Sequence, residues 1–194
     1  LLLSWAATSC VSPSGDVTRG RAERKILIAD VSRAFFEAPA KRDICVRLPE
    51  EALTGGETTQ DTVGKLLASL YGTRDASANW QEEVAKCMAE WGFITGRYNP
   101  CMFHHPTKGV LRLVHGDDFV SVGDDATLSW LKNKLQGRFE IKTKLVGSWK
   151  SDGEVSEARI LNRIIRRTDA GWEYEADQRH ADLIVKETGA DKVS

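Results

Sequence analysis

The sequence has few cysteines, and none has the spacing of a metal-binding pair. Its four Cys residues stand at positions 10, 45, 87 and 101, so no CxxC motif exists. Zinc sites and the disulfide frameworks of small secreted domains are therefore not indicated. Because a chain of 194 residues that is 41% hydrophobic can build a core without cross-links, we expect reduced thiols and an intracellular location.

Long apolar runs and an excess of one charge are also missing. No stretch approaches the about 18 consecutive apolar residues that span a membrane, so we expect no membrane partner. The opening LLLSWAAT follows no basic region, which argues against a signal peptide. Since the sequence does not begin with Met, we expect it to be a piece of a longer chain.

The net charge of −1 conceals an uneven distribution. Residues 131–168 contain ten basic and four acidic residues, whereas residues 169–194 contain three basic and seven acidic residues. A basic block of this kind can contact nucleic-acid phosphates. A solvated, charged surface explains it equally well, so charge alone leaves both interpretations open.

Hydrophobic periodicity predicts a mixed α+β domain. Strands are predicted over residues 25–31, 44–48, 101–105, 110–115, 119–122, 139–144, 159–167 and 172–174. Helices are predicted at LLLSWAA and over residues 75–92, 126–135 and 178–187, with connections at 12–20 and 146–157. Hairpin turns at 106–109 and 169–171, rather than strict βαβ alternation, favour the α+β class.

Two placements of Asp suggest chemistry. Asp30 ends the apolar strand KILIADV, and Asp117-Asp118 stand in a tight turn between two strands. Carboxylates are the ligands that Mg²⁺ prefers, and two such ions can promote phosphoryl transfer. Asp pairs are also ordinary turn and capping residues, and the second pair, Asp124-Asp125, is interpreted as a helix cap. The residue pattern alone leaves both interpretations of Asp117-Asp118 open.

From Ile28 onward, several segments resemble, in order, the reverse transcriptases of Ty1/copia-type retrotransposons. ADVSRAFF at 29–36 resembles the DVKTAFL segment of that family, and SLYGTRDASANW at 69–80 resembles SLYGLKQAPRQW. VHGDDFV at 114–120 stands where the family has YVDDM. Further matches are RYNPCMF at 97–103, FEIK at 139–142 and ILNRI at 160–164.

The resemblance implies a right-hand polymerase palm: an antiparallel sheet backed by helices, with partial fingers and the start of a thumb or connection. It divides the chain into a fingers remnant at 1–24, the palm at 25–145 with an inserted fingers segment at about 44–75, and the palm end and thumb or connection start at 146–194. The implied reaction is RNA-directed DNA synthesis from dNTP on an RNA or DNA template-primer, with Mg²⁺ or Mn²⁺. The implied context is a Gag-Pol-like polyprotein that also contains RNase H and integrase.

The same resemblance implies roles for individual residues. Asp30, Asp117 and Asp118 would be the catalytic carboxylates and would bind the metal together with Val31. The implied nucleotide pocket comprises Ala34, Phe35, Phe36, Tyr71, Gly72 and Arg74, with the Phe35 ring excluding a ribose 2′-hydroxyl. Primer-template contacts are implied for His115, Gly116, Lys142, Lys144 and Arg163.

The sequence departs from the family before the Asp pair, where His115 and Gly116 replace an aromatic and a small apolar residue. Most of the family's fingers precede Ile28, so we expect incomplete fingers here. Three other functions stay open. They are a catalytically inactive retroelement-derived fragment, a nucleic-acid-binding module that uses the basic block, and an unrelated α+β metal phosphotransferase.

Overall fold

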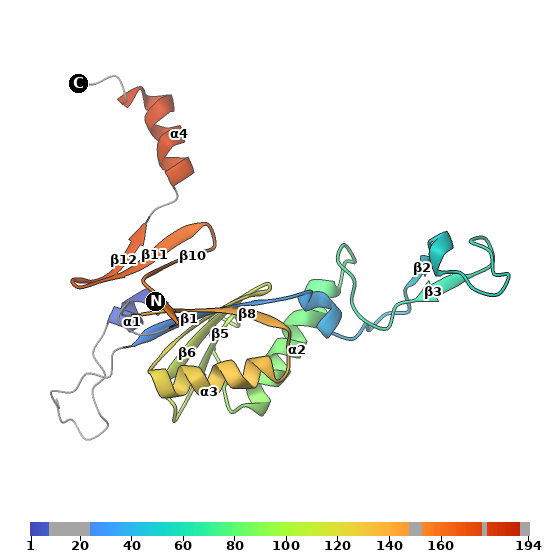
Figure 1. Ribbon diagram of the computed structural model, residues 1–194, viewed down its shortest axis with the longest axis horizontal. Helices are drawn as coiled ribbons and strands as arrows, with labels where there is room; N and C mark the ends of the chain where they lie inside the picture. Colours follow the sequence, from blue (N-terminus) through green and yellow to red (C-terminus); the bar gives the residue numbers. More distant parts are fainter. Residues whose placement is uncertain (8–23, 148–152, 176–177, 191–194) are drawn as a thin grey trace.

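A seven-stranded sheet, in the order β4-β5-β6-β7-β1-β8-β9, forms the centre of the molecule (Figure 1). The computed structural model describes residues 1–7, 24–147, 153–175 and 178–190. The strands are β1 (Lys25–Val31), β4 (Ile94–Thr95), β5 (Met102–His105), β6 (Val110–His115), β7 (Asp118–Gly123), β8 (Ile141–Val146) and β9 (Glu154–Val155). The predictions for β1, β5, β6 and β7 agree with the structure to within one residue at each end. The predicted connection at 12–20 lies outside the described residues.

The sheet is mixed, so the prediction of an antiparallel sheet was wrong at one edge. Every neighbouring pair of strands is antiparallel except β8 and β9, which are parallel. β9 falls within the predicted loop at 146–157. Glu154 of β9 forms an ion pair with Lys25 of β1, which ties this short strand to the edge of the sheet.

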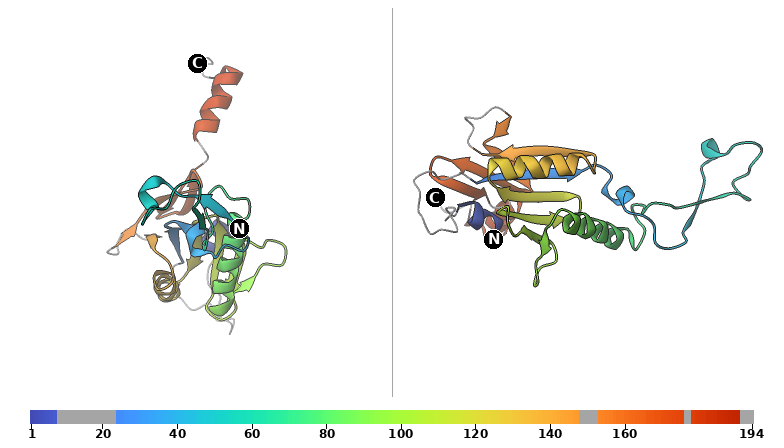
Figure 2. Two further views of the ribbon diagram at one scale, coloured as in Figure 1. Left: turned by 90° about the vertical axis from the view of Figure 1, so that its right-hand side faces the viewer. Right: turned by 90° about the horizontal axis from the view of Figure 1, so that it is seen from below.

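Helices α2 (Ala76–Glu90) and α3 (Asp125–Gln136) cover one face of the sheet (Figures 1 and 2). Both helices bury an apolar stripe at helical spacing, as predicted. The buried residues are Trp80, Val84, Cys87 and Met88 on α2, and Leu128, Leu131 and Leu135 on α3. They pack against Leu27, Ala29 and Val31 of β1, and burial of this area is the main stabilising contribution to the fold.

The helix ends confirm the cap predicted at Asp124, whereas the residue before α2 does not cap that helix. Asp124 precedes α3 and accepts a hydrogen bond from the Thr127 backbone N–H at 2.7 Å, as expected for a cap. Asp75 precedes α2, but its side chain makes no capping bond. It accepts a hydrogen bond from Arg42 at 2.7 Å instead, because the neighbouring guanidinium is the stronger donor.

The opposite face of the sheet is covered only in part. Helix α1 (Leu2–Ala7) and a small antiparallel sheet of β10 (Glu157–Ile160), β11 (Arg163–Thr168) and β12 (Gly171–Glu175) lie over this face. Together with Ile26, Ile28, Val120 and Val122 they form a second apolar core. Helix α4 (Gln178–Thr188) stands away from the rest of the molecule, and none of its residues is buried (Figure 1).

The prediction of one strand over 159–167 was wrong, because β10 and β11 form a hairpin there. Their register pairs Ile160 with Arg163, so Leu161 and Asn162 make a two-residue turn. Both have positive φ, 47° and 63°, as this type of hairpin turn requires. Asn adopts that conformation readily, whereas Leu rarely does, so the turn carries no strong sequence signal. The turn predicted at 169–171 lies between β11 and β12.

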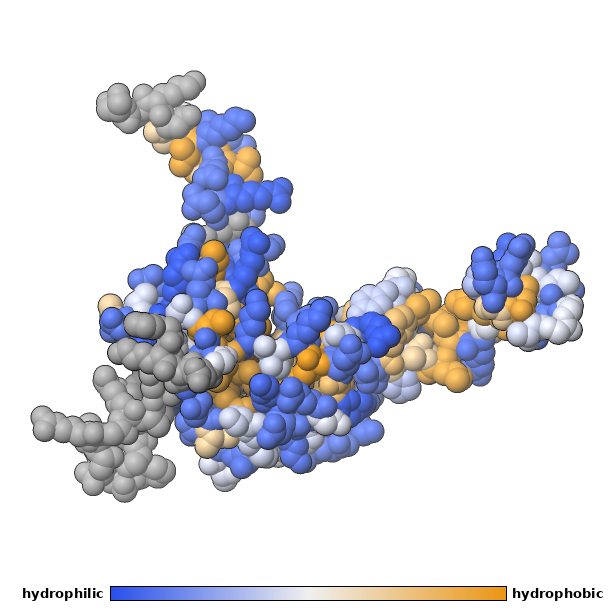
Figure 3. All heavy atoms as spheres, in the orientation of Figure 1, coloured by the Kyte–Doolittle hydropathy of each residue, from blue (hydrophilic) through white to orange (hydrophobic). Residues whose placement is uncertain are grey.

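A long arm leaves the sheet at the end of β1. The chain forms the short helix η1 (Ala34–Glu37) and then a hairpin of β2 (Cys45–Arg47) and β3 (Val63–Lys65), with η2 (Glu50–Ala52) at its tip. Figure 2 shows the arm extending well beyond the body, and Figure 3 shows apolar residues along it. It occupies the segment that we expect to be part of the fingers, and the division into domains stays a prediction.

None of the helices in the described ranges has the length and apolar character needed to cross a bilayer. Cys45, Cys87 and Cys101 are free thiols. Taken together, the strands and helices make the chain an α+β protein. Its mixed sheet is backed by helices on one face and has a partial apolar cover on the other.

Candidate active site

Asp30 and Asp118 lie directly opposite each other on neighbouring strands. The antiparallel register of β1 and β7 pairs Asp30 with Asp118 and Ile28 with Val120. Because side chains alternate along a strand, both carboxylates project on the same face as Ile28 and Val120, away from α2 and α3. The second apolar core covers Ile28, whereas Asp30 and Asp118 are only partly buried.

The connection between β6 and β7 is a two-residue turn of Gly116 and Asp117. His115 and Asp118 pair at its base, and Gly116 has a φ of 62°, which suits Gly at the first position of such a turn. Two hydrogen bonds hold the turn in place. The Val31 backbone N–H donates to the Asp117 carbonyl at 3.1 Å, and the Trp80 indole N–H donates to the Gly116 carbonyl at 2.7 Å.

The three carboxylates at this end of the sheet repel one another. Burial raises the pKa of Asp118, the charges of Asp117 and Asp30 raise that pKa further, and His115 opposes the change. In the described part of the chain, no basic side chain forms an ion pair with any of the three Asp residues. The three carboxylates therefore form a local negative charge that no described side chain neutralises through an ion pair.

The chemistry of these donors suits a hard divalent cation, although the side chains form no closed cage. Among the described residues, no group of three or more His, Cys, Asp or Glu side chains is arranged to hold a metal ion. Mg²⁺, however, usually binds through one or two carboxylates and completes its shell with water and substrate phosphate. The opposed pair of Asp30 and Asp118 can supply two carboxylates, and a bound cation would relieve their repulsion.

Four of the five residues expected to contact primer-template lie beside the carboxylates. His115 and Gly116 belong to the turn, and Lys142 of β8 pairs with Asp30 across the strands. Lys144 lies two residues further along β8, so both exposed Lys side chains share the face of Asp30. Arg163 does not join them, because it belongs to the small sheet, with its guanidinium 5.7 Å from the centre of the Tyr174 ring.

Three residues of the expected nucleotide pocket form an aromatic cluster. The rings of Phe35 and Tyr71 are stacked with centroids 4.3 Å apart, and Phe36 meets Tyr71 edge to face at 5.7 Å. Phe35 also packs against the main core, whereas Phe36 is 45% exposed. Phe35 is thus the inward-facing member of the pair, and its role as a sugar gate stays a prediction.

The other expected pocket residues differ in what they can offer. Ala34 is fully buried, backbone included, so it offers no exposed surface to a ligand. Gly72 has a φ of 90°, so a turn requires it whether or not a ligand approaches. Arg74 is exposed and forms no ion pair with a described residue, which leaves its charge available for a phosphate.

Trp80 has a polar role that its place on the apolar stripe of α2 does not predict. Its indole N–H links α2 to the turn that carries Asp117. A buried Trp normally finds a partner for this group, so the position alone could have prompted a search for an acceptor.

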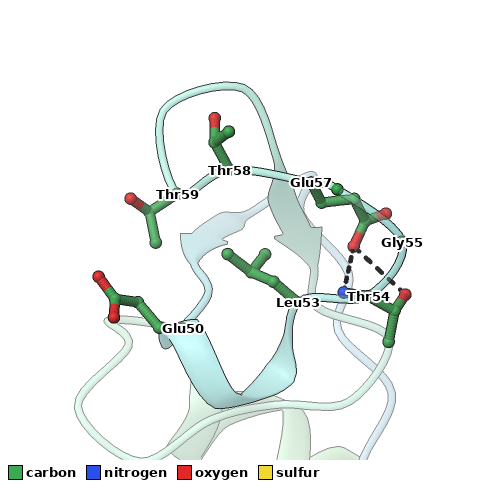
Figure 4. Close-up of a pocket in the computed structure, with 8 residues that line it drawn as sticks. Glu50, Leu53, Thr54, Gly55, Glu57, Thr58 and Thr59 are labelled. Atoms are coloured by element: carbon green, nitrogen blue, oxygen red, sulfur yellow. Dashed lines mark hydrogen bonds between the residues drawn. The ribbon is translucent and has the colours of Figure 1, made fainter.

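Two further hollows lie away from the carboxylates. The tip of the arm has a polar hollow lined by Glu50, Leu53 and three Thr residues (Figure 4), in which Glu57 accepts a hydrogen bond from the Thr54 backbone N–H at 3.0 Å. An apolar cavity of about 630 Å³ lies between α1, the main sheet and the small sheet. The only side-chain polar atoms in its lining come from Ser4, Asn99 and Tyr174, which do not form a recognisable catalytic group.

Comparison with known proteins relates the sequence to part of a polyprotein. No family model matches the sequence. The retrovirus-related Pol polyprotein from transposon TNT 1-94 of Nicotiana tabacum is 27% identical over 117 residues, which cover 58% of this chain and 9% of that polyprotein. The chain is thus similar to a small part of a retrotransposon Pol polyprotein.

Two solved structures also resemble this chain, at low sequence identity. Apo telomerase of Candida tropicalis, truncated from its C-terminal domain, gives a TM-score of 0.46 at 10% identity, covering 78% of this chain and 35% of that one. Telomerase of Candida albicans, in complex with a fragment of telomeric RNA, gives 0.46 at 11% identity, covering 79% and 31%. At these scores the likeness carries no argument about function.

Proposed function

We propose that this chain is a reverse transcriptase domain, an RNA-directed DNA polymerase of a copia-like retrotransposon. The observation that carries the proposal is the direct pairing of Asp30 with Asp118, next to Asp117 in a braced turn. These carboxylates form no ion pair with a described residue, as expected of groups that bind an external cation. The similarity to a retrotransposon Pol polyprotein supports the same assignment.

In this proposal, Asp30, Asp117, Asp118 and the Val31 backbone would hold Mg²⁺, or Mn²⁺ in its place. The bound metal would hold the dNTP triphosphate and lower the pKa of the primer 3′-hydroxyl. The protein's own part is positioning: the hydrogen bonds of Trp80 and Val31 fix the turn that carries Asp117.

The proposed contacts with template-primer lie on the face of the sheet that carries Asp30. Lys142 and Lys144 would contact backbone phosphates of the template-primer without reading its bases. Since the relative is a Pol polyprotein, RNase H and integrase would act together with this domain in the longer protein.

Primer extension tests the proposal. The purified chain is expected to add dNTP to a primer annealed to an RNA template in the presence of Mg²⁺. Asp117→Asn should reduce the rate by more than about 100-fold, because the site loses a charge that holds the metal. Asp169→Asn, an identical change in the exposed turn between β11 and β12, should leave the rate unchanged. Equal rates for both variants would rule out the assignment.

A second candidate is a catalytically inactive retroelement-derived fragment that still binds nucleic acid. One observation favours it: among the described residues, no group of three or more His, Cys, Asp or Glu side chains is arranged to hold a metal ion. This candidate predicts salt-sensitive binding of a template-primer that Asp30→Asn does not weaken, with no extension.

A further inference from the structure

Tyr71 lies in a tight turn just before α2. The Thr73 backbone N–H donates to the Leu70 carbonyl at 3.1 Å, which closes a four-residue turn around Tyr71 and Gly72. Gly72 has a φ of 90°, as the third position of a type II turn requires. The Thr73 hydroxyl also donates to the Leu70 carbonyl, at 2.8 Å. The turn therefore fixes the direction in which Tyr71 projects.

That direction brings Tyr71 onto Phe35. The two ring planes are inclined by 28° with centroids 4.3 Å apart, so the contact is a stack. Phe35 packs against the main core elsewhere on its surface. The Phe35 ring is consequently confined by the core and by the Tyr71 ring, although the two residues belong to different segments of the chain.

We infer that Tyr71 is the positioning residue that holds the Phe35 ring and so sets the choice between deoxyribose and ribose substrates. The inference rests on the proposed function. A ring can exclude a 2′-hydroxyl only if it cannot turn aside, and the stack with Tyr71 restricts that movement. Tyr71 would act through Phe35 rather than by contacting the sugar itself.

Single-nucleotide incorporation measures this effect. The ratio of kcat/KM for dGTP to kcat/KM for GTP is compared among the unchanged chain and its variants on one template. Phe35→Ala should lower the ratio by about 10- to 100-fold, because a pocket loses its steric exclusion of one hydroxyl. Tyr71→Ala should lower it by about three- to tenfold, the strength of an aromatic stack, mainly by improving the use of GTP.

Three more variants separate positioning from other roles. Tyr71→Phe keeps the ring and should keep the ratio. Gly72→Ala should shift the ratio in the direction of Tyr71→Ala, since no atom lies within 4 Å of the added Cβ and only the positive φ is strained. Tyr98→Ala, at a side chain that is 91% exposed, is the matched control and should change nothing.

The Phe35 ring can also be followed without catalysis. A ring stacked on Tyr71 should show upfield-shifted proton resonances in NMR spectra of the folded chain. Tyr71→Ala should abolish that shift, and Tyr71→Phe should retain it. These spectra also report whether each variant is folded.

The outcomes distinguish this inference from the proposed function. If the unchanged chain extends no primer, the proposed function fails and the inference fails with it. If the unchanged chain extends primers and Tyr71→Ala keeps the wild-type ratio, only the inference fails. A Tyr71→Ala variant that raises KM equally for dGTP and GTP would show direct contact with the nucleotide and would also overturn the inference.

Discussion

The charged side chains at the two ends of strand β1 have opposite kinds of neighbours. At its start, Lys25 is buried and donates to Asp125 at 2.9 Å and to Glu154, whose side chain is only 4% exposed. Burial lowers the pKa of Lys25, but the hydrogen bonds to Glu154 and Asp125 outweigh it and raise that pKa. At its other end, Asp30 faces Asp118, a group of like charge.

The difference separates a charge cluster that joins parts of the fold from the carboxylates that we propose to bind metal. The Lys25 charge is paired within the chain and joins β1 to β9 and to the start of α3. The Asp30 cluster forms no ion pair in the described part of the chain, although Lys142 lies opposite Asp30 on β8. Carboxylates that repel one another in this way are typical of a binding site. Opposite expectations for stability follow at the two ends.

The largest change in stability is expected at the Lys25 end. Lys25→Met should lower the free energy of unfolding by about 3–5 kcal/mol, because Glu154 would remain buried without its partner. Urea denaturation followed by circular dichroism measures the change. Asp125→Asn removes the partner that is 65% exposed and should cost less than about 1 kcal/mol. Equal losses in the two variants would contradict a buried structural pair.

Arg112 provides a sharper test, because it is a buried charge without a partner. Its side chain lies on the helix side of β6, fully buried, with its guanidinium 4.0 Å from the centre of the Phe119 ring. None of its side-chain nitrogens has a hydrogen-bond partner, and burial lowers the pKa of Arg112 to about 9. We therefore expect Arg112→Leu to raise the free energy of unfolding by about 1–4 kcal/mol at pH 7.

The pH dependence of this gain follows from the direction of the shift. Between the folded pKa near 9 and the higher unfolded pKa, the unfolded chain binds more protons, so the stability of the wild type rises with pH. The gain from Arg112→Leu should accordingly shrink above pH 9. A gain that is the same at pH 7 and pH 10 would contradict the lowered pKa.

The smallest change in stability is expected at the Asp30 end. The pKa of Asp118 is raised in the folded chain, so its ionised form costs stability as pH rises through that pKa. Asp118→Asn should thus stabilise the chain at pH 7, by less than about 1 kcal/mol at this partly exposed position. At pH 3, where the carboxyl group is largely protonated, the gain should disappear.

Thermal unfolding with and without Mg²⁺ tests whether the same carboxylates bind a cation. A cation that binds only the folded chain raises the melting temperature, so millimolar Mg²⁺ should stabilise the wild type more than Asp118→Asn. Lys25→Met should keep the Mg²⁺ response despite its lower melting temperature. An identical response in the wild type and Asp118→Asn would remove Asp118 from the metal site.

Local patterns predicted much of the fold. Local sequence determines strand β1 and the apolar stripes of α2 and α3, because the residues involved lie close together in the chain. The alternation of Val110, Arg112 and Val114 on β6 also places Arg112 on the buried face.

The rest of the fold and the site depends on contacts between segments that are distant in the sequence, which local patterns do not predict. The Asp pair was noticed from its own turn, but its position opposite Asp30 depends on the β1–β7 register, which no local pattern specifies. The partners of Lys25 come from segments far along the chain, and the parallel pairing of β9 depends on them. The Leu161-Asn162 turn was missed because Leu seldom has a positive φ.

The hydrogen bonds around Gly116 and Asp117 have an entropic consequence. Because the Trp80 indole holds one carbonyl of the turn and the Val31 N–H holds the other, the turn is ordered before any ligand arrives. A cation that binds there has little loop motion left to freeze, so more of its interaction energy remains as affinity. Through the Trp80 side chain, helix α2 would thereby contribute to the proposed cation binding without contacting the ion.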